Sequence, residues 1–218
     1  MDLKEAMEQR HMVRKYTDKI ISDDLIEKIS NRIKENNEKY NINMKLMTNN
    51  EEAVSAIIKL VLAKGVKNYI ILAGDKESNL DEKLGYSGCD IMLYAQTLGL
   101  NTWWVGGTFN RRVSKFVDNK KVIGIIAIGY GQTQGMPHKS KIVEDVSKYN
   151  GDSPEWFLNG IKASLLAPTA LNKQDYKIIG NGNKVKIDIN NGIFTGANKG
   201  LIKYHFELGA GKENFEWE

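Results

Sequence analysis

The chain has 218 residues, of which 41% are hydrophobic and 27% charged, and its net charge is +4. These values are typical of a globular protein, and the chain lacks the dense basic stripe of a nucleic-acid binder. The single cysteine, Cys89, excludes an internal disulfide and paired-cysteine metal sites, and we expect it to be a small core residue. No apolar run approaches the roughly 20 residues of a membrane span, and residues 1–5 lack the apolar core of a signal peptide. We therefore expect a cytoplasmic protein without a membrane partner.

Hydrophobic periodicity predicts a mixture of helices and strands. Before residue 130 it predicts helices over residues 3–9, 51–64, 84–98 and 110–116, a helix that begins at Ser22, and strands over residues 43–47, 69–73 and 121–128.

Three of these segments carry specific expectations. The helix over 51–64 should turn Val54, Ile57, Ile58 and Val61 inward. The second half of helix 84–98 is apolar almost all round, so it should run through the middle of the fold or into an interface. Strand 121–128 is continuously apolar, which indicates burial on both faces.

A polar segment at residues 148–152 precedes Ser153-Pro154-Glu155, which has the composition of a helix start. We place a domain boundary here, between a first domain (1–149) and a second (150–218). The second should contain this helix, a hairpin of strands 176–179 and 185–189, and a last helix over 195–208. His205, on that mostly apolar helix, is expected to be a core histidine.

Arg10 and Arg14 form the first candidate binding element. They lie four residues apart and, in a helical or partly extended turn, could converge on one anion, for which the planar guanidinium is well suited. The alternative, which the segment by itself favours, is a solvated basic turn.

The second candidate is the loop Ala167-Pro168-Thr169-Ala170-Leu171-Asn172-Lys173-Gln174. Pro168 stands where a helix would end, and the following small residues allow the chain to approach a flat ligand. The side chains of Thr169 and Asn172 can donate hydrogen bonds to it. The alternative is a helix end followed by a polar loop.

Two further segments contribute candidates. In Trp103–Phe109, the adjacent Gly106 and Gly107 would let main-chain atoms touch a ring, although a tight turn anchored by two aromatic residues is an equal alternative. Lys139 and Lys141 follow strand 121–128 and could complete an anion site or form a solvated basic loop.

These segments together resemble the nitroreductase family. The pattern A-P-[ST]-A-x-N-x-Q at 167–174 is similar to its flavin-contacting loop, and residues 98–102 match its L-G-L-x-T helix ending. Arg10, His11, Val13, Arg14 and Tyr16 are in register with its opening R-[RH]-S-x-[RK]-x-[FY], although Met12 replaces the usual serine. The likeness is to a two-domain, Thermotoga-type branch.

The resemblance implies an α+β, nitroreductase-like α/β sandwich that binds FMN. Arg10, His11 and Arg14, assisted by Lys139 and Lys141, would hold the phosphate and ribityl chain. The backbone of Gly106 and Gly107, and more weakly of Trp104 and Val105, would face the reactive ring edge. Residues of the later loop would contact the ring, namely Pro168, Thr169, Ala170 and Asn172.

A degenerate internal repeat is a further prediction. Residues 31–34 align with 159–162, and residues 94–99 align with 204–209. Both halves have the same order of helix, loop, strand and long helix. In ordinary nitroreductases one FMN lies between two identical subunits. We therefore expect two halves related by a pseudo-twofold axis, with one FMN per chain, in a monomer of pseudo-dimer architecture or a homodimer.

The implied activity is NAD(P)H-dependent reduction of nitroaromatic, quinone or similar electron-poor acceptors by a ping-pong hydride mechanism. It requires no acid or base side chain, so we nominate no catalytic residue and no metal ligand. Three alternatives stay open: another flavin-dependent reaction on the same scaffold, an FMN storage or sensor protein without turnover, and an α/β module that binds acidic partners through its basic turns.

Overall fold

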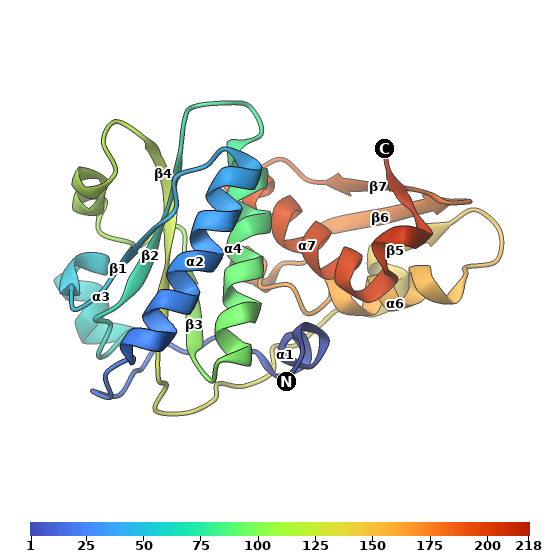
Figure 1. The fold of residues 1–218 in the computed structure, drawn as a ribbon. Coiled ribbons are helices and arrows are strands. Elements are labelled where there is room, and N and C mark those ends of the chain that lie inside the picture. The colour runs from blue at the N-terminus through green and yellow to red at the C-terminus, as the bar shows by residue number, and fades with distance from the viewer.

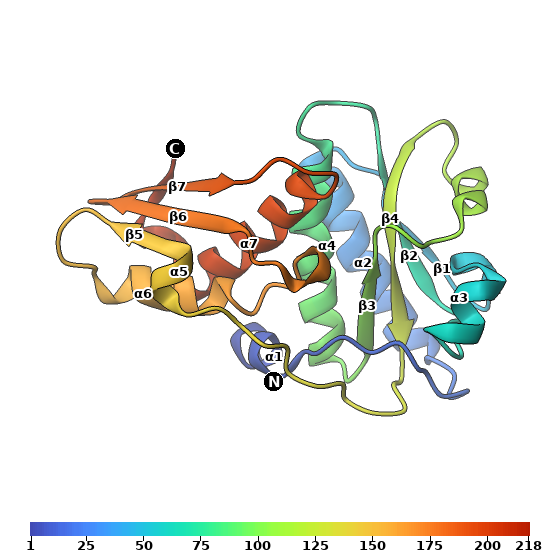
Figure 2. The same cartoon turned by 180° about the vertical axis from the view of Figure 1, so that it is seen from behind.

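The computed structural model describes residues 1–218 and contains two four-stranded sheets, with α4 and α7 between them (Figures 1 and 2). The first sheet has the order β1-β2-β4-β3 and is antiparallel throughout. Its strands are β1 Lys45–Met47, β2 Tyr69–Gly74, β3 Asn101–Val105 and β4 Lys121–Gly129.

The second sheet is mixed, with the order β5-β6-β7-β8. Its outer pairs are parallel and its central pair, β6 with β7, is the predicted antiparallel hairpin. Its strands are β5 Ser147–Tyr149, β6 Tyr176–Asn181, β7 Lys184–Ile189 and β8 Glu216–Trp217.

Seven α-helices and four 3₁₀ turns complete the chain. The helices are α1 Leu3–Gln9, α2 Asp23–Tyr40, α3 Ala56–Val61, α4 Leu80–Thr97, α5 Val143–Val146, α6 Glu155–Ser164 and α7 Thr195–Ala210. The 3₁₀ turns are η1 Glu51–Ala53, η2 Arg111–Phe116, η3 Ala170–Asn172 and η4 Lys212–Asn214. The α+β composition is as predicted. No helix combines the length and the apolar surface that a bilayer crossing requires.

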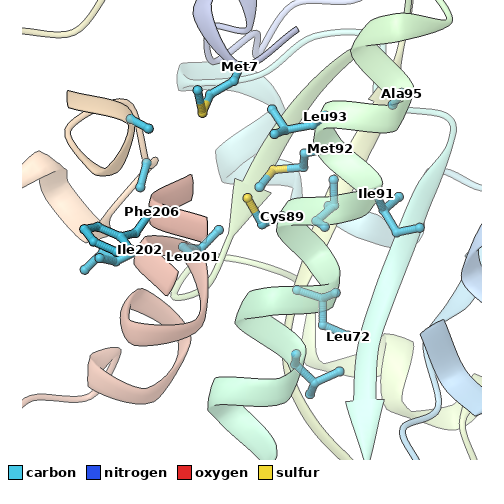
Figure 3. Packing of buried hydrophobic residues seen from close by; sticks show 14 of the residues in the cluster. Met7, Leu72, Cys89, Ile91, Met92, Leu93, Ala95, Leu201, Ile202 and Phe206 are labelled. Atoms are coloured by element: carbon cyan, nitrogen blue, oxygen red, sulfur yellow. The ribbon is translucent and has the colours of Figure 1, made fainter. Parts of the chain in front are cut away.

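Helix α4 is the central element, as its apolar sequence predicts. It packs against α1, α2 and β3, and most extensively against α7. Figure 3 shows the side chains of Cys89 and Met92 directed from α4 toward α7, where Leu201 lies. Cys89 is fully buried, which confirms its assignment as a core residue.

Strand β4 is also central, between β2 and β3, with a different apolar cluster on each side of the sheet. Ile126 and Ile128 face the cluster around α4. Ile125 and Ala127 face a second cluster, which includes Trp103 and Val113. Burial on both faces explains the continuous apolar run.

The predicted helix over 51–64 is wrong as a single element. Val54 has an extended backbone and forms a β-bridge with Phe109, which separates η1 from α3. The side chain of Ser55 then caps α3 as a new helix. As a result Ile57 and Val61, which were predicted to face inward, are 73% and 70% exposed.

The division at 149/150 and the internal repeat both stay predictions. β5 belongs to the second sheet although it precedes the proposed boundary, and α1 and α4 both pack against α7 from the other half. The helix pairs α2–α4 and α6–α7 each pack together, but the two sheets differ in strand direction.

The contact between α4 and α7 yields a prediction about stability. A β-carbon at Gly200 would overlap with the carbonyl oxygen of Glu82 and lie 2.5 Å from the backbone nitrogen of Tyr86. We expect Gly200→Ala to lower the free energy of unfolding by about 3 kcal/mol, measured by urea denaturation, because two backbones must separate. Gly192→Ala is the control, since its nearest neighbouring atom is 3.8 Å away. Equal effects of the two substitutions would contradict the close helix contact.

Candidate functional site

Arg10 is a buried cation without a counterion. It follows α1, and its N–H caps the helix by donating to the carbonyl of Ala6 at 2.8 Å. The residue is only 5% exposed, its Nε atom is buried without a hydrogen-bond partner, and no carboxylate pairs with it. Burial lowers the pKa of the guanidinium, with Cys89 close enough to oppose the shift. Such a group is costly unless an anion accompanies it, so the site fits an anionic ligand.

Arg14 lies in different surroundings. The segment after α1 is extended, with Met12 bridged to Thr102 of β3 and the N–H of Val13 donating to the carbonyl of Thr102 at 3.2 Å. Arg14 is exposed, and its guanidinium carbon lies 5.5 Å from the centre of the Trp103 ring. Trp103 belongs to the cluster on the side of the sheet away from α4. The two predicted phosphate arginines therefore have different neighbours.

His11 and His138 connect the amino-terminal segment with the later loops. A β-carbon at Gly135 would lie 2.8 Å from the Cβ atom of His11, so the loop after β4 packs closely on this residue. The pKa of His11 is lowered by partial burial, and further by the nearby charges of Arg10 and His138. His138 in turn makes a 2.9 Å hydrogen bond from Nε2 to the carbonyl of Leu165.

The loop at 168–174 is fastened to the loop that carries Lys139 and Lys141. The amide of Asn172 donates to the carbonyl of Lys139 at 2.6 Å, and the backbone N–H of Lys141 donates to Oε1 of Gln174 at 2.7 Å. The Lys141 ammonium donates to the carbonyl of Gln174 at 3.0 Å. The Lys139 side chain is exposed. The structure thus brings these two predicted segments together.

Thr169 carries a buried hydroxyl group that makes no hydrogen bond within the chain. It is 9% exposed, and its Oγ1 atom is buried without a hydrogen-bond partner. Its neighbour Pro168 is partly buried, while the N–H of Ala170 donates to Oδ1 of Asn198 in α7 at 3.0 Å. The loop therefore rests on α7 and keeps one unsatisfied hydroxyl.

Gly106 and Gly107 follow β3 and lie against an aromatic side chain. A β-carbon at Gly106 would be 2.8 Å from Cε1 of Phe194, and one at Gly107 would be 3.6 Å from its Cζ atom. Val105 is buried in the cluster around Trp103, whereas Trp104 packs over Gly88 of α4. The glycines are thus a place where a ring touches the main chain.

Sequence reasoning assigned no site role to Phe194, Asn198, His138 or Gln174. Gln174 is part of the matched loop pattern, and its burial to 1% exposure shows that it has a fixed place in the structure. The other three had no sequence signal, because their contacts join segments more than 25 positions apart.

Two surface hollows lie elsewhere. One of about 250 Å³ is formed near Asn43 and Phe116, and one of about 650 Å³ near Tyr86, Asp90 and Glu207. None of the predicted site residues lines either hollow. No group of three or more His, Cys, Asp or Glu side chains is placed to hold a metal ion.

Comparison with solved structures identifies this arrangement as a nitroreductase-type fold. A "putative nitroreductase" from Thermotoga maritima superposes with a TM-score of 0.71 at 21% identity, over 98% of this chain and 85% of that one. A nitroreductase family protein from Streptococcus pneumoniae gives 0.54 at 12% identity, over 66% and 98%. A "putative nitroreductase" from Desulfovibrio desulfuricans, solved in complex with FMN, gives 0.53 at 18% identity, over 71% and 98%.

The family follows from the sequence comparison. The family model described as "Putative TM nitroreductase" matches residues 2–210, so the chain belongs to that family. The predicted resemblance is thereby confirmed. No curated protein matches the chain.

His205 provides a pH prediction that concerns stability. Burial lowers its pKa from 6.5 to about 3, so the unfolded chain takes up the proton first, and stability is lost as the pH falls below 6.5. Between pH 7 and pH 5, we expect this histidine to cost about 2 kcal/mol in the free energy of unfolding. The His205→Gln variant should lose correspondingly less over the same interval in urea titrations. Identical pH dependence in the two proteins would show that His205 titrates normally when folded.

Proposed function

We propose that this protein is an FMN-dependent oxidoreductase that uses NAD(P)H to reduce nitroaromatic, quinone or similar electron-poor acceptors. The family supports oxidoreduction, and the FMN complex of the Desulfovibrio desulfuricans protein supports the cofactor. The observation that carries the proposal is the buried, unpaired guanidinium of Arg10. Arg10 lies close to His11, which is near His138, and His138 is hydrogen-bonded to Leu165 just before the 168–174 loop.

In this proposal the phosphate of FMN is the anion that Arg10 lacks. His11 and Lys139 lie on segments next to it. To assist, the side chains of Arg14 and Lys141 would have to leave the Trp103 ring and the carbonyl of Gln174, respectively. The preference of a guanidinium for phosphate geometry makes Arg10 the main determinant of affinity.

The ring would lie between the two parts of the chain. The backbone N–H groups of Gly106 and Gly107 would donate to its reactive edge, next to Trp104 and Val105, whose side chains lie on opposite faces of the sheet. From the other side, Thr169 would use its unpartnered hydroxyl, while Pro168, Ala170 and Asn172 would supply the surface of the loop. The strands and helix that carry these groups hold them in place without reorganisation.

FMN supplies the hydride transfer when it is bound, and the chain supplies binding, orientation and exclusion of water. Overall, NAD(P)H and a proton reduce a quinone to a hydroquinone and leave NAD(P)⁺. Reductant and acceptor would use the same space in turn, which corresponds to ping-pong kinetics.

The cofactor assignment predicts the stoichiometry and its dependence on Arg10. Purified protein reconstituted with FMN should bind one FMN per chain, as measured by the visible spectrum after gel filtration. Because a charge-assisted hydrogen bond contributes about 1.5–3 kcal/mol, Arg10→Gln should weaken FMN binding about 10- to 100-fold in fluorescence titrations. Arg112→Gln is the matched control, since Arg112 is exposed and far along the chain in η2. Two flavins per chain, or an unaffected Arg10 variant, would contradict the proposed site.

The catalytic part of the proposal predicts turnover. Under anaerobic conditions, addition of NADH or NADPH should bleach the visible band of the bound flavin, and addition of a quinone should restore it. A storage or sensor protein would retain the oxidised spectrum after either nucleotide, and that outcome would replace the enzymatic assignment.

A further inference from the structure

Phe194 lies against Gly106 and Gly107 on the side where a β-carbon would project. It is the residue immediately before α7, and its ring edge lies where a side chain of Gly106 would project. Only a residue without a β-carbon can stand opposite this ring, because the separation would be 2.8 Å. The aromatic ring and the glycine backbone are therefore fitted to each other.

The segment that carries Phe194 is fixed at both sides. Before it, the amide of Asn190 donates to the carboxylate of Asp175 at 2.7 Å, and the hydroxyl of Thr195 donates to the carbonyl of Asn190 at 2.8 Å. After it, the N–H of Asn198 donates to the carbonyl of Phe194 at 2.8 Å, and the side chain of Asn198 accepts from Ala170. These hydrogen bonds therefore fix the position of Phe194 relative to the 168–174 loop.

Apolar side chains of the neighbouring residues lie open to solvent. Ile193 is 89% exposed and Leu171 is 86% exposed, whereas Phe194 is only partly exposed. Leu171 also has a left-handed backbone with φ of 54°, which turns the η3 segment outward. Among these three apolar residues, Phe194 alone contacts the glycines.

From this geometry, and resting on the function proposed above, we propose that Phe194 is a specificity-determining residue that restricts the acceptor to flat, single-ring molecules. In the proposed function the acceptor meets the flavin edge beside Gly106 and Gly107, and the Phe194 ring lies against the same two glycines. A rigid aromatic side chain at this position would take up space that a second fused ring of the acceptor needs. Aromatic rings also favour offset or edge contacts with such a ligand.

The test compares two quinones of different size. For wild type, Phe194→Ala and Phe194→Trp, kcat/KM would be measured with 1,4-benzoquinone and with menadione, which has a second fused ring. Because pocket shape discriminates between substrates by about 10- to 200-fold, Phe194→Ala should raise the menadione-to-benzoquinone ratio about 10-fold. Phe194→Trp should lower it. Ile193→Ala, the adjacent exposed residue, is the matched control and should leave it unchanged.

The outcomes separate this inference from the proposed function. If wild type binds FMN and turns over, but Phe194→Ala shifts the ratio no more than Ile193→Ala does, the specificity role is overturned and the function stands. Loss of FMN from Phe194→Ala, with normal folding, would also overturn it, since the ring would then support the cofactor. A wild-type protein without FMN or turnover would overturn the proposed function, and the specificity role with it.

A stability measurement tests the contact itself without any flavin. Gly106→Ala should lower the urea midpoint of the apoprotein, because the new methyl group meets the Phe194 ring. The double variant with Phe194→Ala should recover most of that loss, which is a coupling expected of residues in contact. Additive effects would show that the ring does not occupy this space, and would overturn the inference.

Discussion

The close contact between α4 and α7 is the constraint on which the rest of the structure depends. Gly85 and Gly200 let the two helix backbones approach each other, with the carbonyl of Ala197 against one and that of Glu82 against the other. Beside this contact, Asp90 of α4 accepts hydrogen bonds from Arg32 and Asn36 of α2 and from Tyr204 of α7. The carboxylate is nearly buried and saturated with donors, so it joins three helices without an unpaired charge. Because α4 leads to β3 and the glycines that follow it, while α7 carries Asn198 and begins directly after Phe194, the helix contact sets the distance between the two sides of the candidate site.

The loop at 168–174 shows how local strain is offset by long-range hydrogen bonds. Leu171, Asn172 and Gln174 all have positive φ, which is unfavourable for residues other than glycine. Hydrogen bonds of two polar side chains offset this unfavourable free energy. Asn172 donates to the carbonyl of Lys139, while Gln174 accepts from the N–H of Lys141 and donates to the carbonyl of Leu165. A loop held this firmly presents its remaining groups in fixed positions. This explains how Thr169 can keep an unsatisfied hydroxyl directed into the protein.

The parts of the fold that sequence predicts well are those where burial dominates. Strand β4 is apolar at nearly every position because clusters lie on both of its faces, and α4 is apolar all round because α2, α7 and the sheet surround it. The prediction of a single helix over residues 51–64 is wrong because here a long-range contact, and not burial, decides the structure. The helical pattern of this segment is overridden by one β-bridge from Val54 to Phe109, a contact between distant residues that periodicity cannot register.

The same distinction applies to the site. Arg10, Thr169 and the two glycines carry local patterns, whereas His138 and Phe194 gain their places only when β4, the following loop and α7 are assembled. Sequence could also not foresee that Arg10 is buried while Arg14 is exposed, because this depends on bridges from Met12 to Thr102 and from Lys15 to Lys64, which replace the turn in which the two side chains would converge.

The electrostatics of this region couple ligand binding to folding. The charge of Arg10 lowers the pKa values of His11 and His205, and its own Nε atom has no hydrogen-bond partner. His205 is kept neutral by burial, so its Nδ1–H can donate to the carbonyl of Leu201 at 2.9 Å, which leaves Nε2 as an unpartnered acceptor. A buried cation without a partner lowers the free energy of unfolding. An anion that pairs with Arg10 would recover that loss, and any ligand that binds only the folded state adds to stability in proportion to its affinity. In the proposed function, the residue that weakens the fold without its ligand is thus the one that would select a phosphate-bearing cofactor.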